Sequence, residues 1–99
     1  MEFDTFSVVF LILNPDVPED EPGQDQIQIA HQAYLGHLRE IGKAIAAGPT
    51  GGQSMRGIVL FNTDVDEART LMSEDPAVRA GWFNLDITPW YVPKGEIKY

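Results

Sequence analysis

Two side chains of this sequence are suited to proton transfer: the imidazole of His31 and the carboxylate of Asp75. An unperturbed histidine titrates near pH ~6.5, so it accepts and returns a proton at neutral pH with little energetic cost. An aspartate that holds one ring nitrogen of a histidine fixes its tautomer and leaves the other nitrogen free to take a proton. A pairing of His31 with Asp75 would therefore form an acid/base device.

His31 lies within the apolar stripe of a predicted helix, with Ile27 before it and Tyr34, Leu35 and Ile41 after it. Positions that recur every three or four residues share one helix face, and an apolar face must be buried. A buried imidazole without a partner costs roughly 1 to 3 kcal/mol. His31 is therefore expected either to line a cavity or to be a core histidine satisfied by its neighbours.

Asp75 precedes Pro76 in the segment SEDPAVRAG. The residue before a proline is disfavoured in helical conformation, so this carboxylate is expected at a fixed turn. The simpler role for Asp75 is to cap the short helix that follows. Capping does not exclude a second contact with a histidine.

Three further residues are candidates for substrate binding. Ser54 and Arg56 open a predicted strand beside a glycine turn, where a hydroxyl and a guanidinium are suited to holding an anion. The alternative is an exposed turn serine and a surface arginine. Tyr34 lies one turn from His31 and can lend its hydroxyl to the same pocket, or simply pack with the hydroxyl reaching water.

Neither a metal site nor a cofactor site is predicted. His37 is six residues after His31, which is not the spacing of two zinc-binding histidines on one helix, and His37 is expected on the solvated face. The glycines at 51–52 lack the lysine and the helix of a phosphate loop, and the acidic segment 16–26 lacks the spacing of a calcium loop. The chain contains no cysteine, so thiolate ligands are absent.

Composition and charge limit the classes of partner that the chain is expected to bind. The chain has 99 residues and a formal net charge of -8, so we expect one domain that does not bind nucleic acid or an anionic membrane surface. The apolar run Phe6–Leu13 is too short to span a bilayer, and acidic rather than basic residues precede it. We therefore expect a soluble cytoplasmic protein.

Periodicity predicts an α+β fold with the element order β-α-β-β-α-β. The expected elements are strand Phe6–Leu13, helix Asp25–Gly42, strands Lys43–Gly48 and Met55–Asn62, a helix capped by Thr63 or Asp64 that runs to Met72, a helical turn from Pro76 to Gly81, and strand Trp82–Trp90. The segments 16–26 and 91–99 show no clear period. This order suits a ferredoxin-like antiparallel sheet with both helices on one face.

The apolar pattern of the first strand predicts that the chain binds a second chain. It is apolar on both faces, whereas the helices of such a fold cover only one face of the sheet. A second copy of the chain that packs sheet to sheet would cover the other face, and twofold dimers are the commonest oligomers. We therefore expect a homodimer.

Three motifs resemble those of the YCII-related, or YciI-like, proteins. They are the H-x-x-x-L helix at His31, the G-K-x-x-x-A-G-P strand of residues 42–49, and the D-P-x-x-x-A-G turn of residues 75–81. With the opening strand and the segment MRGIVLFNTDVDEAR, the resemblance spans nearly the whole chain. The acidic insert at 16–26 and the extension at 91–99 depart from the family pattern.

The resemblance implies a single domain with the dimeric α+β barrel fold, in which His31 and Asp75 match the acid/base pair proposed for the family. Since that family is similar in fold to muconolactone isomerases, it also implies proton transfer on small anionic molecules. We thus expect a lyase or isomerase. The alternatives are a non-catalytic ligand-binding or sensory module, and a structural module in which His31 meets no pocket.

Overall fold

The computed structural model describes residues 1–17 and 23–99, so part of the acidic segment 16–26 lies outside the described residues. The elements follow the predicted order, and the predicted helical turn that begins at Pro76 is the short helix α3. They are β1 (Phe3–Leu13), α1 (Gln24–Glu40), β2 (Ala44–Pro49), β3 (Met55–Phe61), α2 (Val65–Ser73), α3 (Pro76–Arg79) and β4 (Phe83–Pro93).

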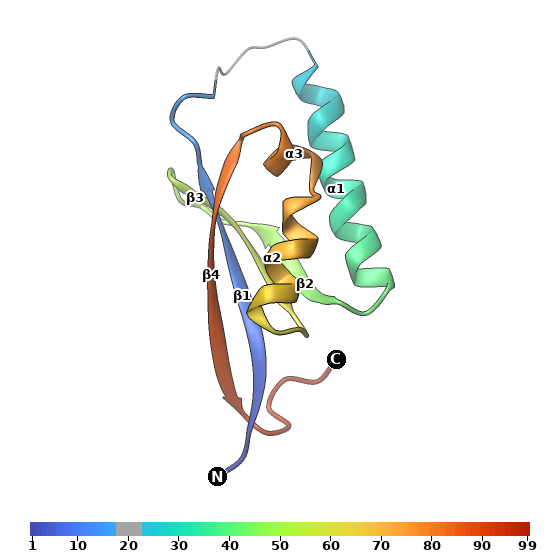
Figure 1. Cartoon of the computed structure of the whole chain (residues 1–99), viewed down its shortest axis with the longest axis vertical. Coiled ribbons are helices and arrows are strands. Elements are labelled where there is room, and N and C mark those ends of the chain that lie inside the picture. The colour runs from blue at the N-terminus through green and yellow to red at the C-terminus, as the bar shows by residue number, and fades with distance from the viewer. Residues whose placement is uncertain (18–22) are drawn as a thin grey trace.

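The four strands form one sheet in the order β2-β3-β1-β4, and the neighbouring strands are antiparallel. All three helices lie on the same side of this sheet, where α1 contacts β2, and α2 and α3 contact β4 (Figure 1). The two central strands are β1 and β3, as a ferredoxin-like fold requires. The predicted α+β class with an antiparallel sheet is confirmed.

Strands β1 and β4 are longer than their apolar patterns predicted. Their ladder runs from Phe3 opposite Pro93 to Leu13 opposite Phe83, so residues 91–93 continue the strand rather than belonging to an irregular tail. The extra residues of each strand supply hydrogen-bond partners for those of the other. The alternation of side chains within one strand does not reveal pairing with another strand. The sequence analysis therefore missed the first residues of β1 and the last residues of β4.

The core lies between the sheet and the helices. Along β1 the side chains of Val9 and Leu11 face the helices and are buried, and they pack with Leu35 of α1 and Met72 of α2. Alternate residues of the half-buried strand, and helix residues spaced three to four positions apart, both direct apolar side chains into this layer. Burial of this layer anchors α1, which carries His31, against the sheet.

Glycines flank helix α1. Gly23 occupies the N-cap position with a φ of 91°, and no side chain caps the first turn. Gly42, the last residue of the expected helix, lies two residues beyond the observed end and adopts a φ of 78°, a left-handed conformation that glycine tolerates. Because the helix ends at Glu40, Ile41 turns away from the core and is 49% exposed, contrary to its expected burial.

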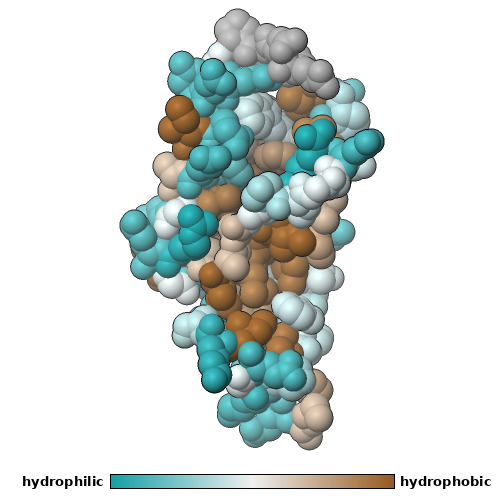
Figure 2. Space-filling view, turned by 180° about the vertical axis from the view of Figure 1, so that it is seen from behind, coloured by the Kyte–Doolittle hydropathy of each residue, from teal (hydrophilic) through white to brown (hydrophobic). Residues whose placement is uncertain are grey.

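The other face of the sheet is apolar and carries no helix. The register places Val8, Phe10 and Ile12 of β1 beside Ile58 and Leu60 of β3 on this face, where all five are only partly buried. Seen from behind, the molecule shows hydrophobic side chains gathered in its middle and hydrophilic ones toward its ends (Figure 2). Within residues 1–17 and 23–99, no helix is long and apolar enough to cross a membrane.

Candidate active site

His31 and Asp75 meet, although they are distant in sequence. His31 Nδ1 lies 2.8 Å from Oδ1 and 2.9 Å from Oδ2 of Asp75. Because an ionised carboxylate only accepts hydrogen bonds, Nδ1 carries the proton and donates it to Asp75. The arrangement fixes the imidazole in the tautomer that leaves Nε2 unprotonated when the ring is neutral.

Asp75 performs both roles considered for it. Its Oδ2 accepts a hydrogen bond from the backbone N–H of Val78 at 3.1 Å, which caps α3, while the same carboxylate holds His31. The side chain is 0% exposed and does not line the cavity described below. Asp75 therefore acts on any ligand only through His31, as a positioning residue.

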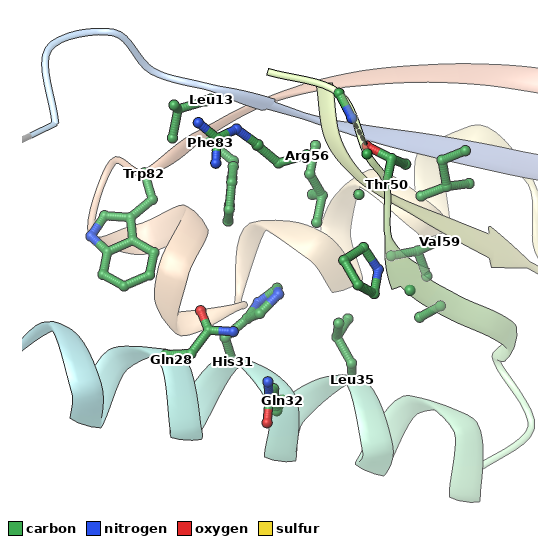
Figure 3. Close-up of a pocket in the computed structure, with 18 of the residues that line it drawn as sticks. Leu13, Gln28, His31, Gln32, Leu35, Thr50, Arg56, Val59, Trp82 and Phe83 are labelled. Atoms are coloured by element: carbon green, nitrogen blue, oxygen red, sulfur yellow. Dashed lines mark hydrogen bonds between the residues drawn. The ribbon is translucent and has the colours of Figure 1, made fainter. Parts of the chain in front are cut away.

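A cavity of about 630 Å³ lies between α1 and the sheet. Its apolar walls are formed by Leu11, Leu13, Leu35, Val59, Trp82 and Phe83. The side chain of His31 points from α1 into this space (Figure 3). In the described part of the chain no hydrogen bond reaches its Nε2, so this nitrogen is available to a ligand.

Arg56 lines the same cavity because of an irregularity in the sheet. Leu11 pairs with Gly57 and Ile12 with Met55, so Arg56 is the extra residue of a β-bulge. Bulges re-aim side chains, and here the guanidinium reaches across the cavity toward Leu13 and Phe83 (Figure 3). Its Nε donates to the carbonyl oxygen of Gln53, which leaves the terminal nitrogens to a ligand.

The other two expected ligand-binding residues do not line the cavity. Ser54 is exposed, and its backbone carbonyl accepts a hydrogen bond from Leu13. The hydroxyl of Tyr34 donates to the carbonyl oxygen of Leu71 at 2.7 Å, and so joins α1 to α2. Burial, together with the nearby negative charges of Glu74 and Asp75, raises the pKa of Tyr34. Tyr34 therefore remains a neutral hydrogen-bond donor near neutral pH.

Other lining residues escaped the sequence analysis. Gln28, Gln32 and Arg39 line the cavity from α1, and Trp82 lines it together with Phe83. The signal was present, since positions 28, 32 and 39 follow the spacing of the helix face that carries His31. Because their side chains are polar, the apolar stripe used to define that face did not include them.

The cavity contrasts in charge with the rest of the molecule. The chain has 15 acidic and 7 basic residues, yet no aspartate or glutamate is among the described lining residues, whereas Arg39 and Arg56 are. Two arginines without a carboxylate favour an anionic ligand. Over residues 1–17 and 23–99, no cluster of three or more histidine, aspartate or glutamate residues is suited to hold a metal ion.

Comparison with known proteins identifies a matching family and a similar solved structure. The profile of the YCII-related domain matches residues 8–91. One similar solved structure is 5-chloro-2-hydroxyhydroquinone dehydrochlorinase (TftG) from Burkholderia phenoliruptrix AC1100 in complex with 2,5-dihydroxybenzoquinone. It has a TM-score of 0.62 and 25% sequence identity, and the match covers 86% of this chain and 92% of that one. A search of curated protein sequences finds no match.

The contact between His31 and Asp75 predicts a measurable coupling. Asp75→Ala should lower the free energy of unfolding by about 2 to 4 kcal/mol, because it removes a helix cap worth about 1 kcal/mol and leaves a buried imidazole unpaired. A double-mutant cycle with His31→Ala, followed by urea denaturation, should give an interaction energy of about 1.5 to 3 kcal/mol.

Asp64→Ala is the matched control. The side chain of Asp64 caps α2 by accepting from the N–H of Glu67 at 2.8 Å, and it is not bonded to a histidine. This variant should lose only the cap contribution of about 1 kcal/mol. Strictly additive effects of His31→Ala and Asp75→Ala would show that the two side chains do not interact.

Proposed function

This chain belongs to the family of YCII-related domains, and on that premise we propose that it is a small-molecule enzyme of the lyase or isomerase type. One observation carries the proposal. The imidazole of His31 is held through Nδ1 by a buried carboxylate while Nε2 faces a cavity large enough for a small molecule.

In the proposed reaction His31 is the general base. Its Nε2 takes a proton from a carbon beside a carbonyl or carboxylate group, so a C–H bond breaks, an N–H bond forms, and the electron pair moves onto the carbonyl oxygen. Asp75 orients the ring and stabilises the imidazolium that results. Return of the proton to another carbon completes an isomerisation, whereas departure of a leaving group completes an elimination.

Arg56 is the residue proposed to bind the negative charge of the substrate. Its terminal nitrogens are suited to a bidentate contact with a carboxylate or an enolate oxygen. The rings of His31 and Phe83 lie 5.9 Å apart at an interplanar angle of 43°, and Trp82 packs edge-on against Phe83. These rings suit a flat, partly apolar substrate, which they would place next to the base.

Similarity to the dehydrochlorinase supports an enzyme of this general type. The loss of a chloride and a proton, which the name dehydrochlorinase describes, is an elimination of the kind a positioned base assists. The ligand in that complex, 2,5-dihydroxybenzoquinone, is a small flat ring that carries oxygens. We propose a substrate of comparable size for this chain, without extending the identity of that ligand to it.

We further propose that the chain acts as a homodimer. The apolar residues of the uncovered sheet face, Val8, Phe10, Ile12, Ile58 and Leu60, support a second copy packed sheet to sheet. Light scattering coupled to size-exclusion chromatography at micromolar concentration should give a mass of twice 11.0 kDa. Phe10→Lys should shift that mass to the monomer value, and a wild-type mass of one chain would contradict the dimer.

Hydrogen exchange tests the proposed chemistry while the physiological substrate is still unidentified. We expect the protein in D₂O to accelerate exchange of the activated C–H of at least one member of a panel of small hydroxyquinones and unsaturated carbonyl acids, as followed by ¹H NMR. His31→Gln should slow that exchange by about 10²- to 10⁴-fold, and Asp75→Asn should also slow it. The surface variant His37→Gln should exchange at the wild-type rate.

Two outcomes would contradict the enzyme. Exchange by His31→Gln at the wild-type rate would show that His31 does not take part in the proton transfer. Binding of panel members without accelerated exchange of any of them would instead support the non-catalytic ligand-binding module.

A further inference from the structure

Building on the proposed function, we infer that Arg39 is a second anion-binding residue of the cavity and that the substrate class is an elongated small molecule with an anionic group at each end. Arg56 binds one end beside His31, and Arg39 binds the other. Both arginines line the cavity, from β3 and α1 respectively.

The two arginines occupy different parts of the cavity. Arg56 lies toward Leu13 and Phe83, across from His31, while Leu35 lies further along α1 (Figure 3). Arg39 is one turn beyond Leu35, and its Cα is about 12 Å from that of His31 along the helix axis at ~1.5 Å rise per residue. A longer molecule with a charged group at each end can therefore contact Arg56 beside His31 at one end and Arg39 at the other.

The side chain of Arg39 extends along α1 over the preceding turn. A methyl group built on Gly36 would lie 3.8 Å from Arg39 Nη2, so the guanidinium lies over the turn that precedes its own Cα. This is the usual direction of long side chains on a helix. It brings the charge closer to the reacting group than the position of the backbone suggests.

Within residues 1–17 and 23–99, neither guanidinium forms an ion pair with a carboxylate. The ion pairs among the described residues join His31 to Asp75, Lys43 to Glu67 and Lys94 to Glu2, and none of them includes Arg39 or Arg56. In a chain with a formal net charge of -8, two such arginines facing one cavity are free to bind ligand anions. Since arginine stays protonated at every accessible pH, this preference does not depend on pH.

The part of the cavity between the two charges is apolar. Leu35 of α1 and Val59 of β3 both line it (Figure 3), as does Pro49 of β2. A ring or an unsaturated chain suits these apolar walls better than a polar linker, because burial of an unpaired polar group is unfavourable. The substrate is therefore charged at its ends and apolar in its middle.

Matched pairs of probes test the inference. Isothermal titration calorimetry would compare benzoate with terephthalate, and biphenyl-4-carboxylate with biphenyl-4,4′-dicarboxylate. In at least one pair the dianion should bind wild-type protein about tenfold more tightly than the monoanion or better, as expected for an added charge-assisted contact. Arg39→Met should abolish that advantage and leave monoanion binding within about twofold of wild type.

Three control variants separate the possible causes. Arg69→Met removes an exposed arginine of α2 that does not line the cavity, so it should retain the preference for dianions. Arg39→Lys should keep part of it, because the charge remains and the planar guanidinium is lost. His31→Gln should keep the preference while losing C–H exchange, so the failure of the dianion inference and the failure of the proposed chemistry produce different results.

The inference would be overturned if monoanions and dianions of both pairs bound wild-type protein equally. It would also be overturned if Arg39→Met weakened a monoanion and its dianion by the same factor, or if it left the preference for dianions unchanged.

Discussion

The hydrogen bond between His31 and Asp75 is the interaction on which the site depends. It joins the middle of α1 to the start of α3, between residues that lie 44 positions apart in the chain. Because Asp75 is fully buried and also caps α3, its carboxylate is fixed on one side by backbone and on the other by the imidazole. The contact that joins α1 to α3 therefore also sets the tautomer and the orientation of the His31 imidazole.

An irregularity of the sheet places Arg56 at the cavity. The bulge between β1 and β3 makes Arg56 an unpaired residue and directs it over the cavity, next to Gly57, whose missing side chain leaves room for Leu11. A regular ladder would have placed residue 56 on the opposite face of the sheet. The side chains of Arg56 and His31 thus reach one cavity from opposite walls.

The sequence predicted the fold and the pairing of His31 with Asp75 for identifiable reasons. The helical spacing, the buried first strand and the turn before Pro76 are local patterns, and the family resemblance joined the two residues. The contributions of Arg39 and Trp82 were missed, and Tyr34 turned out to bond to Leu71, because these placements depend on how α1 is rotated against the sheet and α2. That rotation is set by packing between distant segments, which no single-element pattern contains.

Long-range ¹H–¹⁵N NMR correlation of the histidine rings tests the central claim most directly. At a pH high enough to make the imidazoles neutral, the spectrum of His31 should show the proton fixed on Nδ1 and an unprotonated Nε2, whereas exposed His37 serves as an internal reference for a ring free to exchange tautomers. Asp75→Asn should change the His31 pattern and leave that of His37 alone. A proton on Nε2 of His31 in the wild-type protein, or a spectrum that does not respond to Asp75→Asn, would contradict the account.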